Sequence, residues 1–155
     1  MLAFGALPAA AAQSVDLELV LAVDVSRSID ADEARLQRQG YATALTDARI
    51  IGAIRRGRLG RIAATYVEWA ETQTRQVVVG WSVIEDEASA RAFASNITRA
   101  APTLGFYTSI SGAIEFALPM FDDNGFEGRR RVIDISADGA NNNGRLVTIA
   151  RDQAV

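Results

Sequence analysis

The sequence predicts an α/β fold: a doubly wound, mostly parallel sheet with one antiparallel edge strand and helices on both faces. Strand-like apolar runs alternate with amphipathic helix-like runs, which is the pattern of βαβ units. The run at 17–23 (LELVLAV) is almost entirely apolar, as expected for a central strand buried on both faces. Two further β-rich runs, at 61–69 and 76–84, lie close enough in the chain to form a hairpin, which would supply the antiparallel edge.

Capping residues mark where the helices of this fold should begin. Asp30 is followed three positions later by Glu33, a capping-box pattern, and apolar residues at helical spacing then continue to Ala48. Asp86 can cap another helix, which Pro102 would stop. Both helices therefore have a defined start in the sequence.

The C-terminal half predicts a helix, a loop, a strand and a last helix. Residues 110–121 carry an apolar stripe at helical spacing, and Pro119 should kink or end this helix near its last turn. The polar cluster at 122–125 predicts a loop, and 131–136 (RVIDIS) predicts the next strand. A final helix should begin near Leu146. No repeat or linker interrupts the pattern, and 155 residues suit one domain.

Composition excludes several classes of function. The net charge of −3 gives no electrostatic reason to expect a nucleic-acid partner. The chain has no cysteine and no histidine, which removes structural zinc sites of the usual kind, Cys-His nucleophiles, Ser-His-Asp triads and disulfides. Any metal must therefore be held by oxygen atoms, and oxygen ligands favour Mg²⁺, Mn²⁺ or Ca²⁺.

The N-terminal residues indicate export. Residues 1–12 contain a short apolar stretch followed by small residues that end in three alanines, which is typical of the end of a signal peptide. We therefore expect 1–12 to be a signal-peptide remnant, a mature protein that begins near Gln13, and a periplasmic or secreted location. The alternative is an apolar tail without this role. No other segment approaches the roughly 20 apolar residues of a membrane span.

Hydroxyl and carboxylate side chains follow the carboxyl ends of two predicted strands. Asp24, Ser26 and Ser28 come directly after one strand, Asp138 comes after another, and Thr108 precedes a helix. Ligands of open parallel sheets bind at this edge. Together these residues offer three hydroxyls and two carboxylates, which suit an octahedral cation that keeps some water, most simply Mg²⁺ or else Mn²⁺ or Ca²⁺.

The D-x-S-x-S sequence at 24–28 resembles the metal-ion-dependent adhesion site of von Willebrand factor A and integrin I-type domains. In that family two serines and a later threonine contact the metal, whereas the first and a final aspartate act largely through water. The resemblance therefore implies such roles for Thr108 and Asp138. The stretch at 133–144 is also similar to a bacterial family of exported von Willebrand A-like proteins. The resemblance covers 15–155, which we take as the domain.

Two features depart from the family pattern. The family usually has a glycine two positions before the threonine, where this chain has Phe106, with Gly105 one position further back. The family's domain also continues for at least one more strand and helix, so we expect a C-terminally incomplete domain with an unpaired sheet edge. We interpret the run at 141–143 (NNN) as a turn, because asparagine tolerates the left-handed backbone conformation that turns require.

The resemblance implies a binding function rather than turnover. The metal would keep an open position that accepts an acidic residue of a protein partner. The first alternative is a Mg²⁺-dependent hydrolase with Asp24 as nucleophile or base, although the chain has no histidine and no phosphate-binding glycine loop. A degenerate, purely structural domain is the second alternative. A dinucleotide-binding fold would need a G-x-G-x-x-G after its first strand, which is absent.

Overall fold

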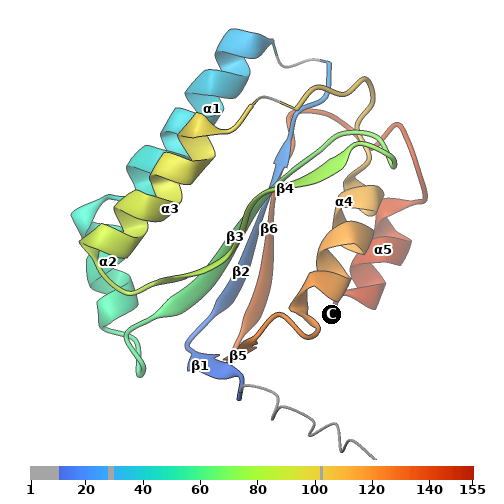
Figure 1. Cartoon of the computed structure of the whole chain (residues 1–155). Coiled ribbons are helices and arrows are strands. Elements are labelled where there is room, and N and C mark those ends of the chain that lie inside the picture. The colour runs from blue at the N-terminus through green and yellow to red at the C-terminus, as the bar shows by residue number, and fades with distance from the viewer. Residues whose placement is uncertain (1–10, 28–29, 102) are drawn as a thin grey trace, which may run out of the picture.

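The computed structural model describes residues 11–27, 30–101 and 103–155, and it confirms the predicted α/β fold. Its main sheet has four strands in the order β4-β3-β2-β6 (Figure 1). Strand β2 pairs in parallel with β3 and with β6, whereas β4 is antiparallel to β3 and lies at one edge, as expected. The strands are β2 (Glu18–Asp24), β3 (Ile62–Trp69), β4 (Arg75–Ile84) and β6 (Arg131–Ser136).

Helices cover both faces of the sheet (Figure 1). Helices α1, α2 and α3 cover one face, and α4 and α5 cover the other. Their bounds are α1 (Ala31–Leu45), α2 (Ala48–Arg55), α3 (Glu87–Arg99), α4 (Ile110–Ala117) and α5 (Val147–Gln153), and a 3₁₀ turn, η1 (Leu118–Phe121), follows α4. None of the described helices is long and apolar enough to cross a membrane.

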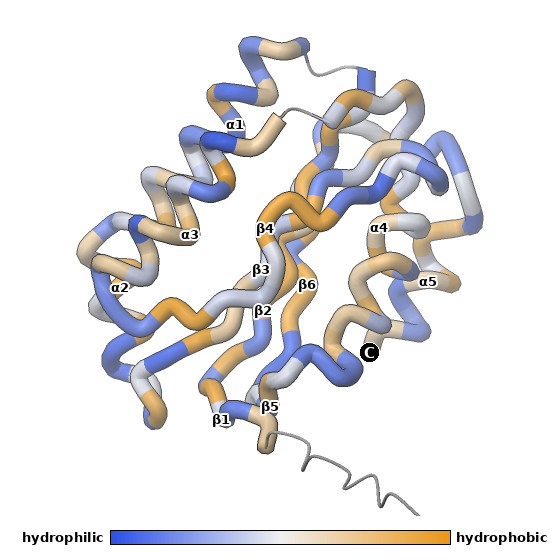
Figure 2. Tube along the Cα trace, in the orientation of Figure 1, coloured by the Kyte–Doolittle hydropathy of each residue, from blue (hydrophilic) through white to orange (hydrophobic). Residues whose placement is uncertain are grey.

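Strand β2 is buried on both faces because it supplies side chains to two hydrophobic layers. Figure 2 colours the chain by hydropathy and shows that apolar residues are frequent along the strands of the sheet. Leu21 and Val23 pack with the α1 and α3 side of the sheet, whereas Val20 and Ala22 pack with α4 and η1. Successive side chains of a strand point to opposite faces, so a central strand between two helical layers is apolar along most of its length. This explains why the run at 17–23 shows no alternation.

The predicted helix starts are confirmed, and one predicted helix is divided. Asp30 and Asp86 both form capping boxes, with Glu33 and Ser89 as their reciprocal partners. The apolar face expected to run on to Ala48 is interrupted, because α1 ends at Leu45 and Asp47 caps a separate helix, α2. The apolar residues keep their helical spacing across the break, so the sequence pattern does not indicate that one helix ends and another begins there.

The predicted helix at 110–121 is α-helical only for its first part. Pro119 lies within η1, where the chain changes from α to 3₁₀ geometry, since proline lacks the N–H that continues an α-helix. The 122–125 loop is confirmed, with Asp123 and Gly125 at φ values of 49° and 83°. Pro102, the expected stop of the preceding helix, and most of the predicted leader at 1–12 lie outside the described residues.

A short parallel ladder between β1 (Gln13–Val15) and β5 (Phe126–Gly128) was not expected. It lies at the end of the main sheet where the parallel strands begin (Figure 1). Each strand has only three residues, too few for an alternation to be recognised in the sequence. The opposite end of the sheet, where the parallel strands finish, holds the polar residues considered next.

Candidate metal centre

Four of the five predicted metal ligands lie at the end of the sheet where the parallel strands finish. Asp24 is the last residue of β2, Ser26 follows it, and Asp138 comes two positions after the end of β6. Thr108 lies just before α4 and donates a hydrogen bond from Oγ1 to the Ser26 Oγ over 3.2 Å. The fifth, Ser28, lies outside the described residues.

Asp24 is fully buried and only partly satisfied. Its Oδ1 accepts a hydrogen bond of 2.7 Å from the backbone N–H of Ser26. Its Oδ2 is buried and has no hydrogen-bond partner among the described residues. Burial raises the pKa of the Asp24 carboxyl above its ordinary value, and the nearby charge of Asp138 adds to this, although hydrogen bonds from Ser26 oppose both effects.

An anionic carboxylate with an unpartnered oxygen is costly in a buried position. Removing a charge from water is unfavourable unless another charge or several hydrogen bonds replace the hydration. At this site the Asp24 Oδ2 has no such replacement within the described chain, and the neighbouring Asp138 is of the same sign. A cation bound beside Asp24 would supply the missing compensation.

The loop that carries Thr108 packs closely against the ends of β2 and β3. The Gly105 N–H donates to the Val25 carbonyl over 3.1 Å, and the Ser109 N–H donates to the Ala70 carbonyl over 2.8 Å. A Cβ atom at Gly105 would lie 2.1 Å from the Ala70 Cβ, so no larger residue fits this backbone path. Gly105 therefore allows the close approach, although it is one position earlier than the family pattern places its glycine.

The carboxylate of Glu71 also fixes this loop. Its Oε2 accepts hydrogen bonds from the backbone N–H groups of Phe106 (2.8 Å) and Tyr107 (3.2 Å), and its Oε1 accepts one of 2.5 Å from Thr74 Oγ1. The bond from Thr74, together with the two backbone N–H groups, lowers the pKa of Glu71 to about 2. Glu71 is thus held as an anion by the loop that it orients.

The Asn141–Asn143 run does more than turn the chain. The side-chain oxygens of Asn141, Asn142 and Asn143 accept hydrogen bonds from the backbone N–H groups of Ser111 (3.1 Å), Thr108 (2.9 Å) and Thr72 (3.1 Å), respectively. The loop after β6 is thereby joined to the loops after β3 and α3. Sequence reasoning missed this role, because only the folded chain brings these N–H groups within reach.

The backbone of the Asn141–Asn143 run also bonds to Thr108, and the chain just before this run brings Asp138 close to Thr108. The N–H groups of Asn142 and Asn143 both donate to the Thr108 carbonyl, over 2.9 and 3.1 Å. A Cβ atom built on Gly139 would lie 3.7 Å from Thr108 Oγ1, so the Asp138-Gly139 turn passes directly over the threonine hydroxyl. Residues from three loops thus converge on one small region.

A buried ion pair holds the start of the Thr108 loop. Arg38 of α1 donates from Nε and Nη2 to the Glu68 carboxylate over 2.6 and 2.8 Å, and both side chains are almost fully buried. Arg38 also donates to the carbonyls of Ala100 and Ala101, and Glu68 accepts the Thr103 N–H at 3.3 Å. The pair therefore links α1 and β3 to the segment that leads to Thr108, a role the sequence analysis did not predict.

The family model described as "Protein of unknown function (DUF1194)" matches residues 14–155. The chain belongs to this family. No curated protein matches the DUF1194 chain. Solved structures do match, and this chain spans less than two fifths of the length of the first ones compared. The proximal thread matrix protein 1 of the mussel byssus has a TM-score of 0.65 at 15% identity, with 93% of this chain and 36% of that chain covered.

Two other solved structures extend the likeness. The vWF domain of the type V pili tip protein Mfa5 from Porphyromonas gingivalis has a TM-score of 0.52 at 14% identity, with 82% of this chain and 39% of that one covered. The mussel protein was also solved with its MIDAS motif occupied by zinc, and this form has a TM-score of 0.53 at 18% identity, covering 83% and 30%. These likenesses show that the DUF1194 chain has a von Willebrand factor A-like fold.

The oxygen atoms at this site of the DUF1194 chain would restrict the kind of metal that it could hold. Within residues 11–27, 30–101 and 103–155, no group of three or more carboxylates could hold an ion. The described donors at this site are two carboxylates, Asp24 and Asp138, and two hydroxyls, Ser26 and Thr108. Such a set suits a hard divalent cation that keeps part of its water shell.

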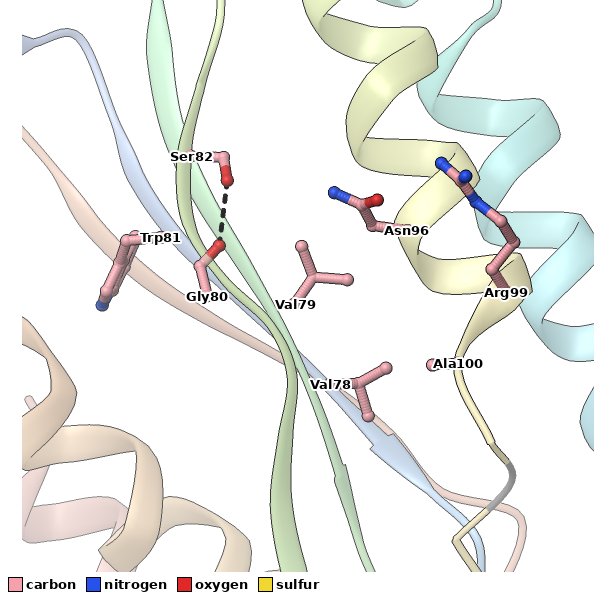
Figure 3. A pocket seen from close by; sticks show the side chains of 8 residues that line it. All are labelled: Val78, Val79, Gly80, Trp81, Ser82, Asn96, Arg99 and Ala100. Carbon is pink, nitrogen blue, oxygen red and sulfur yellow. Dashed lines mark hydrogen bonds between the residues drawn. The ribbon is translucent and has the colours of Figure 1, made fainter.

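A separate surface pocket of about 460 Å³ lies between β4 and α3 (Figure 3). Figure 3 shows Val79 of β4 facing Asn96 of α3 and Val78 facing Ala100, with Arg99 on the far side of the helix. Among the described residues, its lining includes one charged side chain, that of Arg99, and no carboxylate. The pocket therefore lacks the acid and base groups that hydrolysis requires.

Proposed function

We propose that this DUF1194 domain binds a divalent cation, Mg²⁺ in preference to Mn²⁺ or Ca²⁺, and uses it to bind another protein. Asp24, Ser26, Ser28, Thr108 and Asp138 would hold the ion. The observation that carries the proposal is the fully buried Asp24 carboxylate, whose Oδ2 has no hydrogen-bond partner among the described residues. A cation is the simplest group that removes this cost.

The residue types suggest how the bound ion would act. Neutral hydroxyls as direct ligands, with carboxylates acting through water, leave much of the ion's positive charge uncompensated. An ion in this state attracts an anionic ligand from outside the protein. We therefore propose that a glutamate or aspartate of the partner completes the coordination, and that binding weakens as the pH falls toward the carboxylate pKa of about 4.

Solved structures with the same fold support this assignment. The mussel matrix protein has a MIDAS motif that was solved with zinc bound. The pilus adhesin SpaC of Lactobacillus rhamnosus GG shares the fold at a TM-score of 0.56 and 15% identity, over 84% of this chain and 16% of that one. By analogy with these pilus and matrix proteins, we propose an exported location, either periplasmic or secreted.

The two alternatives fit the site less well. As a nucleophile or base in a Mg²⁺-dependent hydrolase, Asp24 would have to reach a substrate, but its side chain is fully buried. In a degenerate, purely structural domain, an apolar or amide side chain at position 24 would be more stable than a buried carboxylate with an oxygen that has no partner among the described residues. Metal-dependent binding accounts for both observations.

Affinity capture with a Thr108 variant tests the proposal. The immobilised chain should retain a protein from an exported-protein extract in Mg²⁺, release it in EDTA and bind it again when Mg²⁺ is restored. Thr108→Ala removes the hydroxyl that contacts Ser26 and should abolish this capture. Thr98→Ala, which removes a hydroxyl bonded within α3, is the matched control and should have no effect.

The same preparation distinguishes binding from catalysis. A panel of phosphate esters should show no Mg²⁺-dependent turnover with the wild-type chain. Mg²⁺-dependent hydrolysis that disappears in Asp24→Asn would contradict the binding function and support the hydrolase. Capture that EDTA does not reverse would contradict the role of the metal.

A further inference from the structure

The loop before Thr108 exposes three large apolar side chains beside the candidate metal centre. Leu104, Phe106 and Tyr107 are 64%, 67% and 57% exposed, respectively. All three lie in the four residues that precede Thr108. A single exposed apolar side chain is common, but several gathered at one place mark an interaction site. We call these three residues the apolar rim.

The backbone of the apolar rim is held in place before any partner binds. Glu71 accepts the N–H groups of Phe106 and Tyr107, and Gly105 packs against Ala70. At the end of the loop, the Thr108 N–H donates to Asn142. A partner that contacts the rim would therefore lose less free energy to ordering the loop than if the loop were unsupported.

Charge restricts what the apolar rim can accept. The segment 100–110 contains no charged side chain. Both oxygens of Glu71, the carboxylate that contacts this loop, are already engaged, one by Thr74 and the other by the two loop N–H groups. A basic side chain of a partner would have to compete with these three hydrogen bonds for Glu71, whereas an apolar side chain would bury surface against the rim.

We propose that the apolar rim receives a large aliphatic or aromatic side chain that lies within a few residues of the partner's metal-binding acidic residue. The partner segment would place its carboxylate at the metal beside Thr108 and its apolar side chain against Phe106 and Tyr107. The rim can act in this way only if the metal-dependent binding proposed above is correct, so its role rests on the proposed function.

Random peptides displayed on phage provide the probe. The full chain is immobilised in Mg²⁺, and phage are eluted with EDTA. The eluted peptides should contain an acidic residue with a Phe, Trp, Leu or Ile within three positions. Synthetic copies of these peptides should bind Phe106→Ser and Tyr107→Ser about 10-fold more weakly, the size of effect expected when a buried anchor is lost. The affinity of both variants for Mg²⁺ alone, measured by calorimetry, should match that of the wild type.

Ile50→Ser is the matched control, because Ile50 is an exposed apolar residue of α2 outside the metal centre, and it should bind the peptides as the wild type does. The eluted peptides could instead have an acidic residue but no apolar neighbour, and bind Phe106→Ser as tightly as the wild type. This result would overturn the proposed role of the apolar rim and leave the proposed function intact. Absence of any EDTA-eluted peptide would overturn both. Peptides that bind the rim without metal, or dimerisation lost in Phe106→Ser, would also overturn the inference.

Discussion

Asp24 is the residue whose environment most constrains the function of the domain. Three buried side-chain polar atoms lack a hydrogen-bond partner among the described residues: Asp24 Oδ2, the Tyr66 hydroxyl and the Trp69 indole N–H. The tyrosine and the tryptophan are neutral, and leaving such a group unsatisfied costs about 1–3 kcal/mol. A carboxylate costs more, because its charge must also be removed from water. The fold therefore tolerates at Asp24 a cost that a bound cation would offset.

Replacing Asp24 by asparagine should stabilise the metal-free protein. The amide keeps the shape of the side chain and can still accept the Ser26 N–H, but it carries no charge. In EDTA at neutral pH we expect the free energy of unfolding to rise by about 1 kcal/mol, which raises Tm by about 2–4 °C. Thermal unfolding followed by circular dichroism measures the change.

In Mg²⁺ the wild type should be more stable than Asp24→Asn, the reverse of the result in EDTA. The wild type should gain stability from the ion and Asp24→Asn should not, because binding to the native state stabilises it. Asp134→Asn, the same substitution at an exposed carboxylate of β6, should leave both measurements unchanged. A metal-free Asp24→Asn protein that is less stable than the wild type would show that this carboxylate supports the fold by itself.

At the scale of elements, the loop between α3 and α4 is positioned by residues far away in the chain. Glu71, Asn142 and the Arg38–Glu68 pair each hold part of it, and all of them belong to other elements. Breaking the buried Arg38–Glu68 pair would leave an uncompensated charge, so this pair in particular holds its part of the loop strongly. The position of the Thr108 loop therefore depends on contacts from several neighbouring segments.

The low pKa of Glu71 predicts how stability depends on pH. The pKa of the Glu71 carboxyl is about 2 in the folded protein and 4.5 in its ordinary state. Between these two pH values this group therefore binds fewer protons in the folded protein than in the unfolded chain. Its contribution to stability is therefore complete above pH 4.5 and is lost as the pH falls toward 2. Since Glu71 is partly exposed, we expect this contribution to be only about 1 kcal/mol.

Glu71→Gln should remove this part of the pH dependence. The free energy of unfolding is measured by urea denaturation at several pH values between about 2 and 5. Its increase with pH should be smaller for the variant than for the wild type. Glu127→Gln changes an exposed carboxylate of β5 outside this loop and serves as the control. Identical slopes for Glu71→Gln and the wild type would mean that the loop N–H groups do not favour the ionised form.

At the scale of the whole molecule, the sequence predicted the parts of the fold that local patterns determine. The run at 17–23 indicated a central strand, and the capping-box pattern at Asp30 and the cap at Asp86 marked two helices correctly. Because parallel strands finish at the same edge, the positions of Asp24 and Asp138 after two such strands were enough to predict that they lie together.

The features that the sequence did not predict depend on long-range contacts or on very short elements. Arg38 and Glu68 are 30 positions apart, and the Asn142 contact with Thr108 spans 34 positions, so no local pattern relates these pairs. The β1–β5 ladder has strands of three residues each, and the break between α1 and α2 falls within a continuous apolar spacing. Tertiary packing decides all of these features.

Calorimetric titration of the purified chain with Mg²⁺, repeated with Mn²⁺, tests the central claim most directly. We expect one saturable site per chain, and strongly weakened binding in Asp24→Ala, Ser26→Ala and Asp138→Ala, because each removes a ligand or a group that orients one. Asp134→Ala, at an exposed carboxylate of β6, should bind as the wild type does. No binding by the folded wild type, or unchanged titration curves for all three site variants, would contradict the metal centre.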